Sequence, residues 1–314
     1  MSILKLQAPV KDNLWGGRRL IDEYNKKTSG DIAAESWELS CYPQSESVIE
    51  NGEFAGKPLT EYIWTKGKKI LGKNCEKFED FPILIKFIDA RKDLSLQVHP
   101  SDEYALKNEN QYGKTEMWYI IDAEEGSFLY YGFNREITKE EFARRIEDET
   151  LTEVLNAYPV QKGDVVFIEA GTLHAIGAGI LLAEIQQNSN VTYRVYDYGR
   201  RDKDGNLREL HVDKALEVTN LYPVKKVKKP EPHIGTCKYF TVDKVNLTGD
   251  KTNKVSGIVS DDSFLHILIL EGEGTITVGD EKMDYKKGDS YFIPAESGEY
   301  ELAGKCEAIF TYVL

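Results

Sequence analysis

The stretch Lys162–Ala170, KGDVVFIEA, indicates the fold class of this chain. A Lys-Gly-Asp turn opens a short run of β-branched and aromatic residues and Gly171 closes it, which is typical of a strand between two turns. The same pattern returns as KGDSYFIPA at Lys287–Ala295. Copies so far apart favour a duplicated domain over a solenoid, whose repeats are about 20–50 residues long. Only the first copy continues to a histidine, His174, so we expect the second copy to lack metal ligands.

Short strand-like runs of this kind fill most of the chain. Their close spacing predicts an all-β fold, a sandwich or barrel, with a few inserted helices. We expect strands at Ile83–Ile88, Leu94–His99, Met117–Ile121, Ser127–Tyr131, Asp164–Ile168, Leu181–Gln187, Thr192–Tyr198, Phe264–Leu270, Gly274–Val278 and Ser290–Ile293. One or two helices are expected at Thr138–Leu155, where Thr138 and Glu141 have the form of a capping box. Further helices are expected at Leu59–Leu71, Glu103–Lys107 and Asp213–Val218.

The segment Tyr222–Pro232 divides the chain into two predicted domains. It holds three prolines and four lysines and shows almost no apolar periodicity, as expected of an exposed connection. We therefore predict a first β domain over residues 1–230, with a helical insertion near 138–155. A second β domain is predicted over residues 231–314.

The composition argues against several classes of partner. The 314 residues include 40 Lys and Arg against 53 Asp and Glu, a net charge of −13. An acidic chain without a basic stripe is a poor candidate for binding nucleic acid or an anionic membrane, although a locally positive pocket can still hold a small anion. The longest apolar run, Phe264–Leu270, is far shorter than the roughly 20 residues of a membrane span, and the N-terminus lacks the pattern of a signal peptide. The four cysteines are scattered and form no CxxC pair, so the sequence suggests neither a zinc knuckle nor a disulfide framework. We therefore expect a cytoplasmic protein.

Two histidines and a glutamate lie at the ends of predicted strands. Strand alternation places Gln97 and His99 on one face and the aliphatic residues beside them on the other. His174 follows the Gly171 turn, and Glu116 precedes an apolar strand, where a carboxylate is costly unless it is paired or metal-bound. Two imidazoles, a carboxylate and a further oxygen donor suit Zn²⁺ with an open coordination position. The same set describes the facial triad of non-haem iron oxygenases, so the spacing leaves both metals open.

Other polar side chains interrupt apolar strands. Glu184, Gln186 and Asn188 share one face, which is unusual if it points into the core and ordinary if it points to solvent. Arg194 could reach into a barrel mouth or lie on the surface. Lys86 stands in the middle of an apolar strand and is therefore expected to point inward.

At these residues the sequence resembles a known family. Five motifs occur in family order, among them LQVHPSDEYA, KTEMWYII, GDVVFIEAGTLHAI and EIQQNSNVTYRVYDYGR. On them the chain resembles type I mannose-6-phosphate isomerase in its short bacterial form, strongly over about residues 1–220 and weakly beyond. The resemblance implies cupin jelly-roll barrels, two here with the second lacking metal ligands. The family's zinc ligands fall on Gln97, His99, Glu116 and His174, and its catalytic arginine falls on Arg194.

The activity that the resemblance implies is zinc-dependent aldose–ketose isomerisation. With one Zn²⁺ per chain, D-mannose 6-phosphate and D-fructose 6-phosphate would interconvert through an enediol or enediolate. The small phosphorylated sugar is the expected partner, and the oligomeric state stays open. Two alternatives remain: an Fe(II) cupin oxygenase using His99, Glu116 and His174, and a sugar-binding cupin without turnover.

Roles follow for the remaining polar residues. We interpret Arg194, Glu184 and Lys86 as catalytic, and Lys114, Gln186 and Asn188 as substrate-binding. One of the three cations among them is expected to meet the phosphate. Proton transfer is open between Glu184, a lysine of lowered pKa and a metal-bound water.

Overall fold

The computed structural model of the chain describes residues 3–201, 204–224, 233–250 and 253–314. The chain forms two compact units. The first unit comprises Met1–Lys11, Arg18–Phe87 and Lys229–Leu314, and the second comprises Asp12–Gly17 and Ile88–Lys228.

This grouping differs from the predicted division into two consecutive domains. The strand β1 (Leu4–Gln7) pairs antiparallel with β19 (Ser290–Ile293), with Leu4 opposite Phe292. The N-terminal residues therefore complete a sheet whose other strands come mainly from the C-terminal part of the chain. The predicted boundary at residues 230 and 231 lies outside the described residues and stays a prediction.

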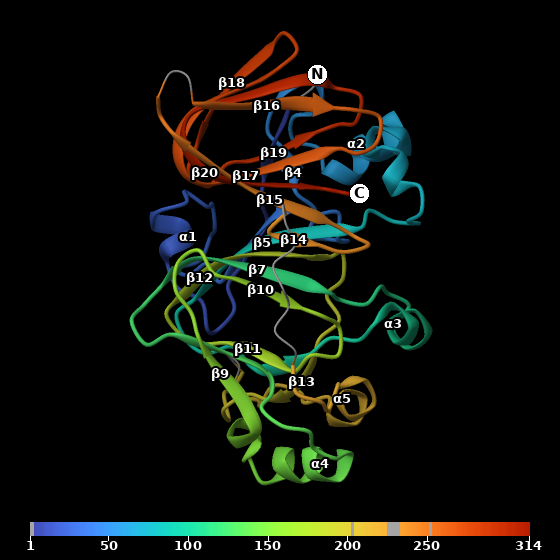
Figure 1. Ribbon diagram of the computed structural model, residues 1–314, viewed down its shortest axis with the longest axis vertical. Coiled ribbons are helices and arrows are strands. Elements are labelled where there is room, and N and C mark those ends of the chain that lie inside the picture. The colour runs from blue at the N-terminus through green and yellow to red at the C-terminus, as the bar shows by residue number, and fades with distance from the viewer. Residues whose placement is uncertain (1–2, 202–203, 225–232, 251–252) are drawn as a thin grey trace. The chain divides into compact units, whose positions relative to one another are not determined.

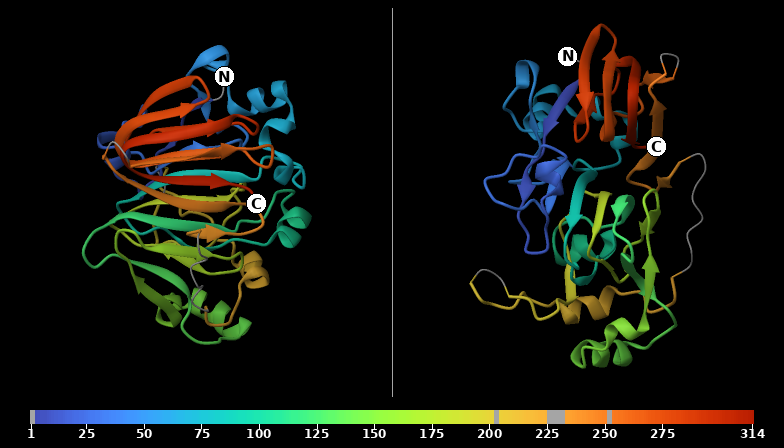
Figure 2. Two further views of the ribbon diagram at one scale, coloured as in Figure 1. Left: turned by 45° about the horizontal axis from the view of Figure 1, so that its top comes forward. Right: turned by 90° about the vertical axis from the view of Figure 1, so that its left-hand side faces the viewer.

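The first unit is built on a nine-stranded antiparallel sheet. Its C-terminal strands are orange and red in Figure 1 and Figure 2, and its N-terminal strands are blue. The strand order is β14-β15-β20-β17-β19-β1-β4, with β16 paired to β20 and β18 paired to β17. Its C-terminal strands are β14 (Gly235–Thr236), β15 (Thr241–Thr248), β16 (Lys254–Val259), β17 (Leu265–Val278), β18 (Glu281–Lys286) and β20 (Gly298–Tyr312). The N-terminal part adds β2 (Val10–Lys11), β3 (Glu35–Leu39), β4 (Val48–Ile49), α1 (Arg19–Asp22), α2 (Leu59–Lys66) and the 3₁₀ turns Gly52–Phe54, Lys68–Leu71 and Lys73–Cys75.

One long strand replaces two predicted short ones in this sheet. The runs Phe264–Leu270 and Gly274–Val278 form the single strand β17, and the glycines between them do not make a turn. The register of β17 against β20 shifts between Ile269 and Glu271, and Gly272 has φ +90°. A β-bulge, which glycine tolerates at positive φ, has thus taken the place of the expected break.

The second unit contains two antiparallel sheets. Five strands pair in the order β13-β6-β11-β8-β9, and β7 pairs with β10 on one side and β12 on the other. The bounds of the first set are β6 (Leu96–Val98), β8 (Phe128–Phe133), β9 (Leu155–Pro159), β11 (His174–Ile176) and β13 (Tyr193–Tyr196). The strands of the second set are β7 (Glu116–Ala123), β10 (Val165–Ile168) and β12 (Ile180–Gln187). The chain passes from the first unit to the second within β5 (Ile83–Ala90).

Helices cover the outer face of the five-stranded sheet. The second unit contains α3 (Asp102–Asn108), α4 (Lys139–Glu147), α5 (Val212–Val218) and the 3₁₀ turn Leu151–Val154. Apolar residues of α4, α5 and this turn pack with side chains of β6, β11 and β13 in one buried cluster. The predicted helices are confirmed, and Thr138 caps α4 as expected, because its hydroxyl accepts a hydrogen bond of 3.1 Å from the Glu141 N–H.

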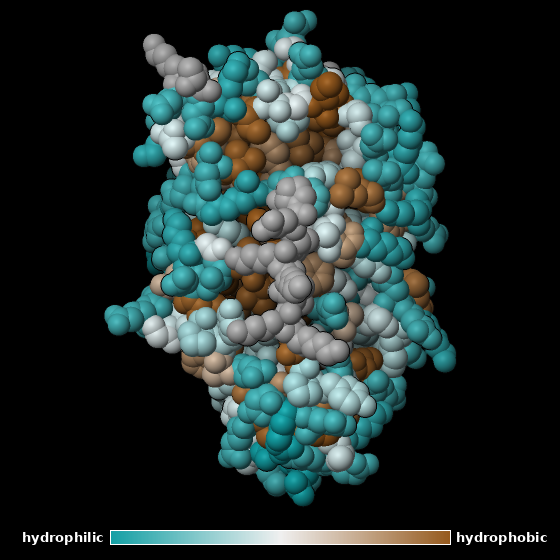
Figure 3. Space-filling view, viewed as in Figure 1, coloured by the Kyte–Doolittle hydropathy of each residue, from teal (hydrophilic) through white to brown (hydrophobic). Residues whose placement is uncertain are grey.

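The all-β prediction with a few inserted helices is confirmed. No helix of the described residues is both long and apolar enough to cross a membrane. On the face that Figure 3 shows, hydrophilic side chains predominate over apolar patches, in keeping with the acidic composition.

Candidate functional site

The register of the five-stranded sheet brings three predicted site residues into one row. Gln97 on β6 lies opposite His174 of β11 on one side and opposite Arg194 of β13 on the other. Residues directly opposite each other in a sheet point to the same face. Their neighbours Leu96 and Val98 belong to the apolar cluster under the helices, so the row points the other way, into the unit. The predicted alternation along this strand is confirmed.

The second sheet contributes a polar block of four residues. Glu116 on β7 lies opposite Gln186 of β12, and Trp118 lies opposite Glu184. All four side chains are buried. The polar face of β12, whose orientation the residue types left open, is therefore turned away from solvent.

His99, Glu116 and His174 meet between the two sheets and form a cluster that can hold a metal ion. One ligand atom from each residue lies within 4.8 Å of the other two. Nε2 of His174 is 3.3 Å from Oε1 of Glu116, and Nε2 of His99 is 3.6 Å from Oε2. All three side chains are at most 1% exposed. Two nitrogens and a carboxylate at this spacing suit a transition metal.

Hydrogen bonds to backbone carbonyls fix the orientation of both imidazoles. Nδ1 of His99 lies 2.9 Å from the Val191 carbonyl oxygen, and Nδ1 of His174 lies 2.8 Å from that of Thr172. A carbonyl only accepts, so each Nδ1 carries the proton and each Nε2 keeps its lone pair. Burial lowers the pKa of His174 to about 4, which keeps this ring neutral at pH 7. Its Nε2 is buried and makes no hydrogen bond to any described residue, so the donor set fits a metal.

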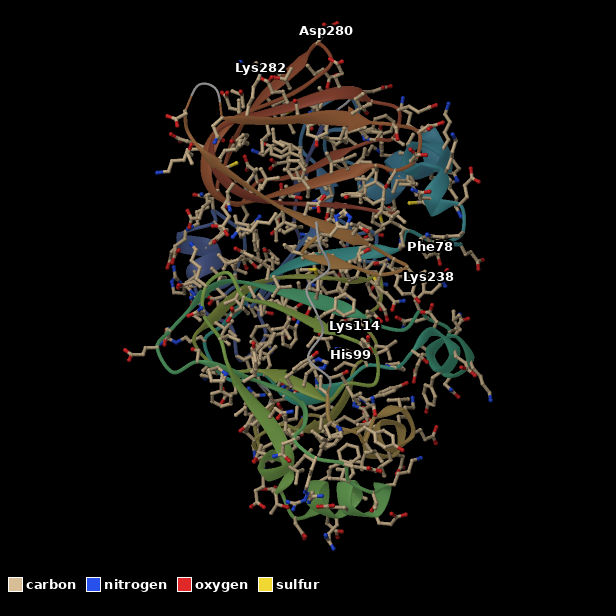
Figure 4. All side chains as sticks on the ribbon, viewed as in Figure 1. Phe78, His99, Lys114, Lys238, Asp280 and Lys282 are labelled. Carbon is tan, nitrogen blue, oxygen red and sulfur yellow. The ribbon has the colours of Figure 1, made fainter. Side chains whose placement is uncertain are left out.

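Lys114 joins this cluster to Glu184. Its ammonium lies 3.0 Å from Oε2 of Glu116, 3.2 Å from Nε2 of His99 and 3.8 Å from Oε1 of Glu184. Figure 4 labels His99 and Lys114, whose side chains lie next to each other inside the second unit. The other oxygen of Glu184, Oε2, accepts a hydrogen bond of 3.0 Å from the Trp118 indole.

The two predicted amides nearest the cluster differ in their surroundings. Gln97 is half-buried, and its Oε1 is 3.5 Å from the Ser95 hydroxyl. Gln186 is fully buried and donates two hydrogen bonds of 2.7 Å to the carbonyls of Gln187 and Ser189. Its Oε1, like Oδ1 of Asn188 just beyond β12, is buried and makes no hydrogen bond within the described ranges.

Lys86 is the predicted site residue that belongs to the other compact unit. It is buried on β5, 3.8 Å from Oε2 of Glu35 and 5.1 Å from the ring centre of Trp37. It points inward as expected, and its catalytic role stays a prediction.

Arg194 lies beside a cluster that the sequence reasoning missed. It donates from Nε to the Ser95 hydroxyl at 3.2 Å and from Nη1 to the Glu209 carbonyl at 3.0 Å. Arg200 and Arg208 both bind the buried carboxylate of Asp197, at 3.2 Å and 2.7 Å from their Nε atoms.

These charges perturb one another. Burial lowers the pKa of Arg194, and the charge of Arg208 lowers it further. Burial alone would raise the pKa of Asp197, but the hydrogen bonds from Arg208 and Arg200 hold it below its ordinary value. The spacing between Asp197 and Arg208 carries no motif, so only the folded loop brings them together.

Two family models match the chain. The catalytic domain of type I phosphomannose isomerase matches residues 3–129, and the cupin domain of mannose-6-phosphate isomerase matches residues 232–313. The cupin fold class is therefore confirmed, and the lack of metal ligands in the second cupin stays a prediction.

Relatives match over nearly the whole chain. Mannose-6-phosphate isomerase ManA of Bacillus subtilis (strain 168) is 38% identical, with 96% of each chain covered. The mannose-6-phosphate isomerase of Streptococcus mutans serotype c is 34% identical, with 98% of each covered. The crystal structure of the Bacillus subtilis mannose 6-phosphate isomerase superimposes with a TM-score of 0.91 at 32% identity and full coverage of both chains. By these similarities the chain belongs to the type I phosphomannose isomerases, which are aldose–ketose isomerases.

Proposed function

We propose that this chain interconverts mannose 6-phosphate and fructose 6-phosphate with the help of one zinc ion. The observation that carries the proposal is the buried cluster of His99, Glu116 and His174, with Arg194 in the same strand register beside it. The names of the relatives supply the substrate, and the residues of this chain supply a site with chemistry that suits it.

Zinc fits the donor set better than a harder cation would. Two neutral imidazoles and one carboxylate are ligands that zinc prefers, and the neutral Gln97 amide is the proposed fourth ligand. Gln97 shares a face with His174 because the two lie opposite each other in the sheet. With a single anionic ligand, the bound ion would supply Lewis acidity toward the oxygens of the sugar.

We assign the substrate's phosphate to Arg200 and Arg208, which lie beside Arg194. Arg200 and Arg208 share the single carboxylate of Asp197, so this pair keeps an excess of positive charge. Guanidinium groups bind phosphate oxygens through paired N–H donors, which favours them over the single ammonium of Lys114 or Lys86. Arg194 itself faces the metal cluster, through its register with Gln97.

Glu184 is the proposed acid–base residue. Isomerisation moves a proton from C2 of the aldose to C1, and a carboxylate held near both carbons can accept and return it. Glu184 is buried, with Oε2 bonded to Trp118 and Oε1 facing Lys114. Gln186 and Asn188 offer buried amide oxygens to the sugar hydroxyls.

A coupled assay for fructose 6-phosphate formed from mannose 6-phosphate tests the proposal. We expect turnover in the purified protein, loss of turnover after dialysis against a chelator, and recovery when Zn²⁺ is added back. Oxygen uptake, measured in parallel, should stay at background. An enzyme that turns over fully after complete metal removal would contradict the role of the cluster.

The two alternative functions find no support in the comparisons. The relatives bear the name of an isomerase, and neither an Fe(II) oxygenase nor a non-catalytic sugar-binding protein is among those reported above. We place the reaction in the cytoplasm on the acidic, cysteine-poor composition of the chain.

A further inference from the structure

Trp118 makes a contact for which the proposed mechanism gives no reason. The side chain is fully buried in the second unit, on the face of β7 that also carries Glu116. Its indole packs edge-on against His174, with 5.4 Å between ring centres and 77° between planes. Its Nε1–H donates to Oε2 of Glu184 at 3.0 Å. A buried indole N–H needs an acceptor, and here that acceptor is the carboxylate to which the proposed mechanism gives the acid–base role.

From this geometry we infer that Trp118 is the positioning residue for the Glu184 carboxylate. Trp118 and Glu184 are direct cross-strand partners on β7 and β12, so the backbone fixes the distance between them. The indole has one donor and no acceptor, so it binds one carboxylate oxygen and helps to orient the group while the other oxygen faces elsewhere.

The selected orientation directs the second oxygen toward the reaction. With Oε2 held by Trp118, Oε1 faces the Lys114 ammonium at 3.8 Å, and Lys114 lies 3.0 Å from Glu116. A carboxylate free to rotate about its terminal bond would present Oε1 to the substrate for only part of the time. Proton transfer depends steeply on such placement, so Trp118 should act on turnover more than on binding.

The inference rests on the proposed role of Glu184 and is tested by a double-mutant cycle. Trp118→Phe keeps an aromatic ring against His174 and removes the donor. We expect it to lower kcat by about 10–100-fold, by analogy with the loss of a partner that orients a metal ligand. KM should stay within about twofold, and the metal content should equal that of the wild type. Trp64→Phe is the matched control, because Trp64 is 84% exposed on α2 and should leave all three quantities unchanged.

The Glu184→Ala background separates this inference from the proposed function. Loss of an acid–base residue costs about 10²–10⁴-fold, a rate that an assay run over hours still resolves. In that background, Trp118→Phe should change kcat by less than about twofold. An equal loss in both backgrounds, a kcat near wild type in Trp118→Phe, or loss of metal in proportion to activity would each overturn the inference. A wild-type rate in Glu184→Ala would overturn the role of Glu184 and this inference with it.

A second replacement guards against a folding defect. If Trp118→Phe does not fold, the indole can be replaced by benzothiophene through incorporation of benzothienylalanine at position 118. That side chain has the shape of tryptophan, with sulfur in place of the N–H. The same 10–100-fold loss in kcat would support the inference, and wild-type turnover would overturn it.

Discussion

Replacing Arg194 by alanine should slow turnover while the metal stays bound. Within the described part of the chain, two of the five N–H donors of Arg194 are directed at Ser95 and the Glu209 carbonyl, and the others can meet a ligand. If one of them meets charge that develops on the sugar oxygens, its loss should cost about 10²–10³-fold in kcat, or about 2.7–4 kcal/mol. Arg194→Lys should recover only part of this, since an ammonium reproduces neither the planar fork nor both protein contacts.

Steady-state kinetics and metal analysis of the two variants check this prediction. A loss in kcat at constant KM and full metal content is the expected result, because the contact would strengthen only in the transition state. A rise in KM for the phosphorylated sugar at nearly constant kcat would instead assign Arg194 to phosphate binding alone. Wild-type kcat in Arg194→Ala would refute the reasoning from strand register to catalysis.

Substitutions at His174, Asp197 and His266 should have separable effects. His174→Ala should lose tightly bound metal and activity. His266→Ala is the control, because it removes an equally buried histidine from the first unit. It should keep the full metal content, as measured by elemental analysis. Asp197→Asn should lower the free energy of unfolding by about 1–3 kcal/mol in urea titrations, because Arg200 and Arg208 lose the charge they share. Burial lowers the pKa of His266 to about 3. Below pH 6.5 the unfolded chain therefore binds a proton that the folded chain does not. As the pH falls from 6.5 to 5, the free energy of unfolding should decrease by about 2 kcal/mol. His266→Gln should show a correspondingly shallower pH dependence, and an unchanged slope would contradict this assignment.

The local features of the fold were predictable because each depends on a few neighbouring residues. The cap at Thr138 and the strand around Gln97 follow from rules that act over one or two turns of chain. The pairing of β1 with β19 could not be predicted in this way, since the partners are nearly 300 residues apart and neither carries a specific signal. The sequence predicts two strands separated by a turn around Gly272, where the structure has a β-bulge, because glycine is typical of both turns and bulges.

In the candidate site, too, local patterns predict some residues, and contacts between strands determine the others. Alternation groups Gln97 with His99 on one face, and the positions of Glu116 and His174 at strand ends add these two residues. The resemblance then assigns the same four residues as ligands. Trp118 lies two residues from Glu116 on the same face of β7, but a tryptophan in an apolar strand carries no sequence signal that distinguishes a site residue from the core. The orientation of Glu184 depends on a partner in another strand, which no pattern within β12 reveals.

The apolar cluster under α4 and α5 is also what keeps the candidate site in register. Leu96, Val98 and Ala175 lie on the outer faces of the strands that carry Gln97 and His174 on their inner faces. Because side chains alternate, a slip of one residue would turn the polar residues into the apolar cluster and the apolar ones into the site. Burying even one unpaired polar group costs about 1–3 kcal/mol, and such a slip would bury several at once. Apolar residues on the opposite face of these strands therefore help to hold the proposed metal ligands in place. A substitution in this cluster such as Phe142→Ala should weaken metal binding although it removes no proposed ligand.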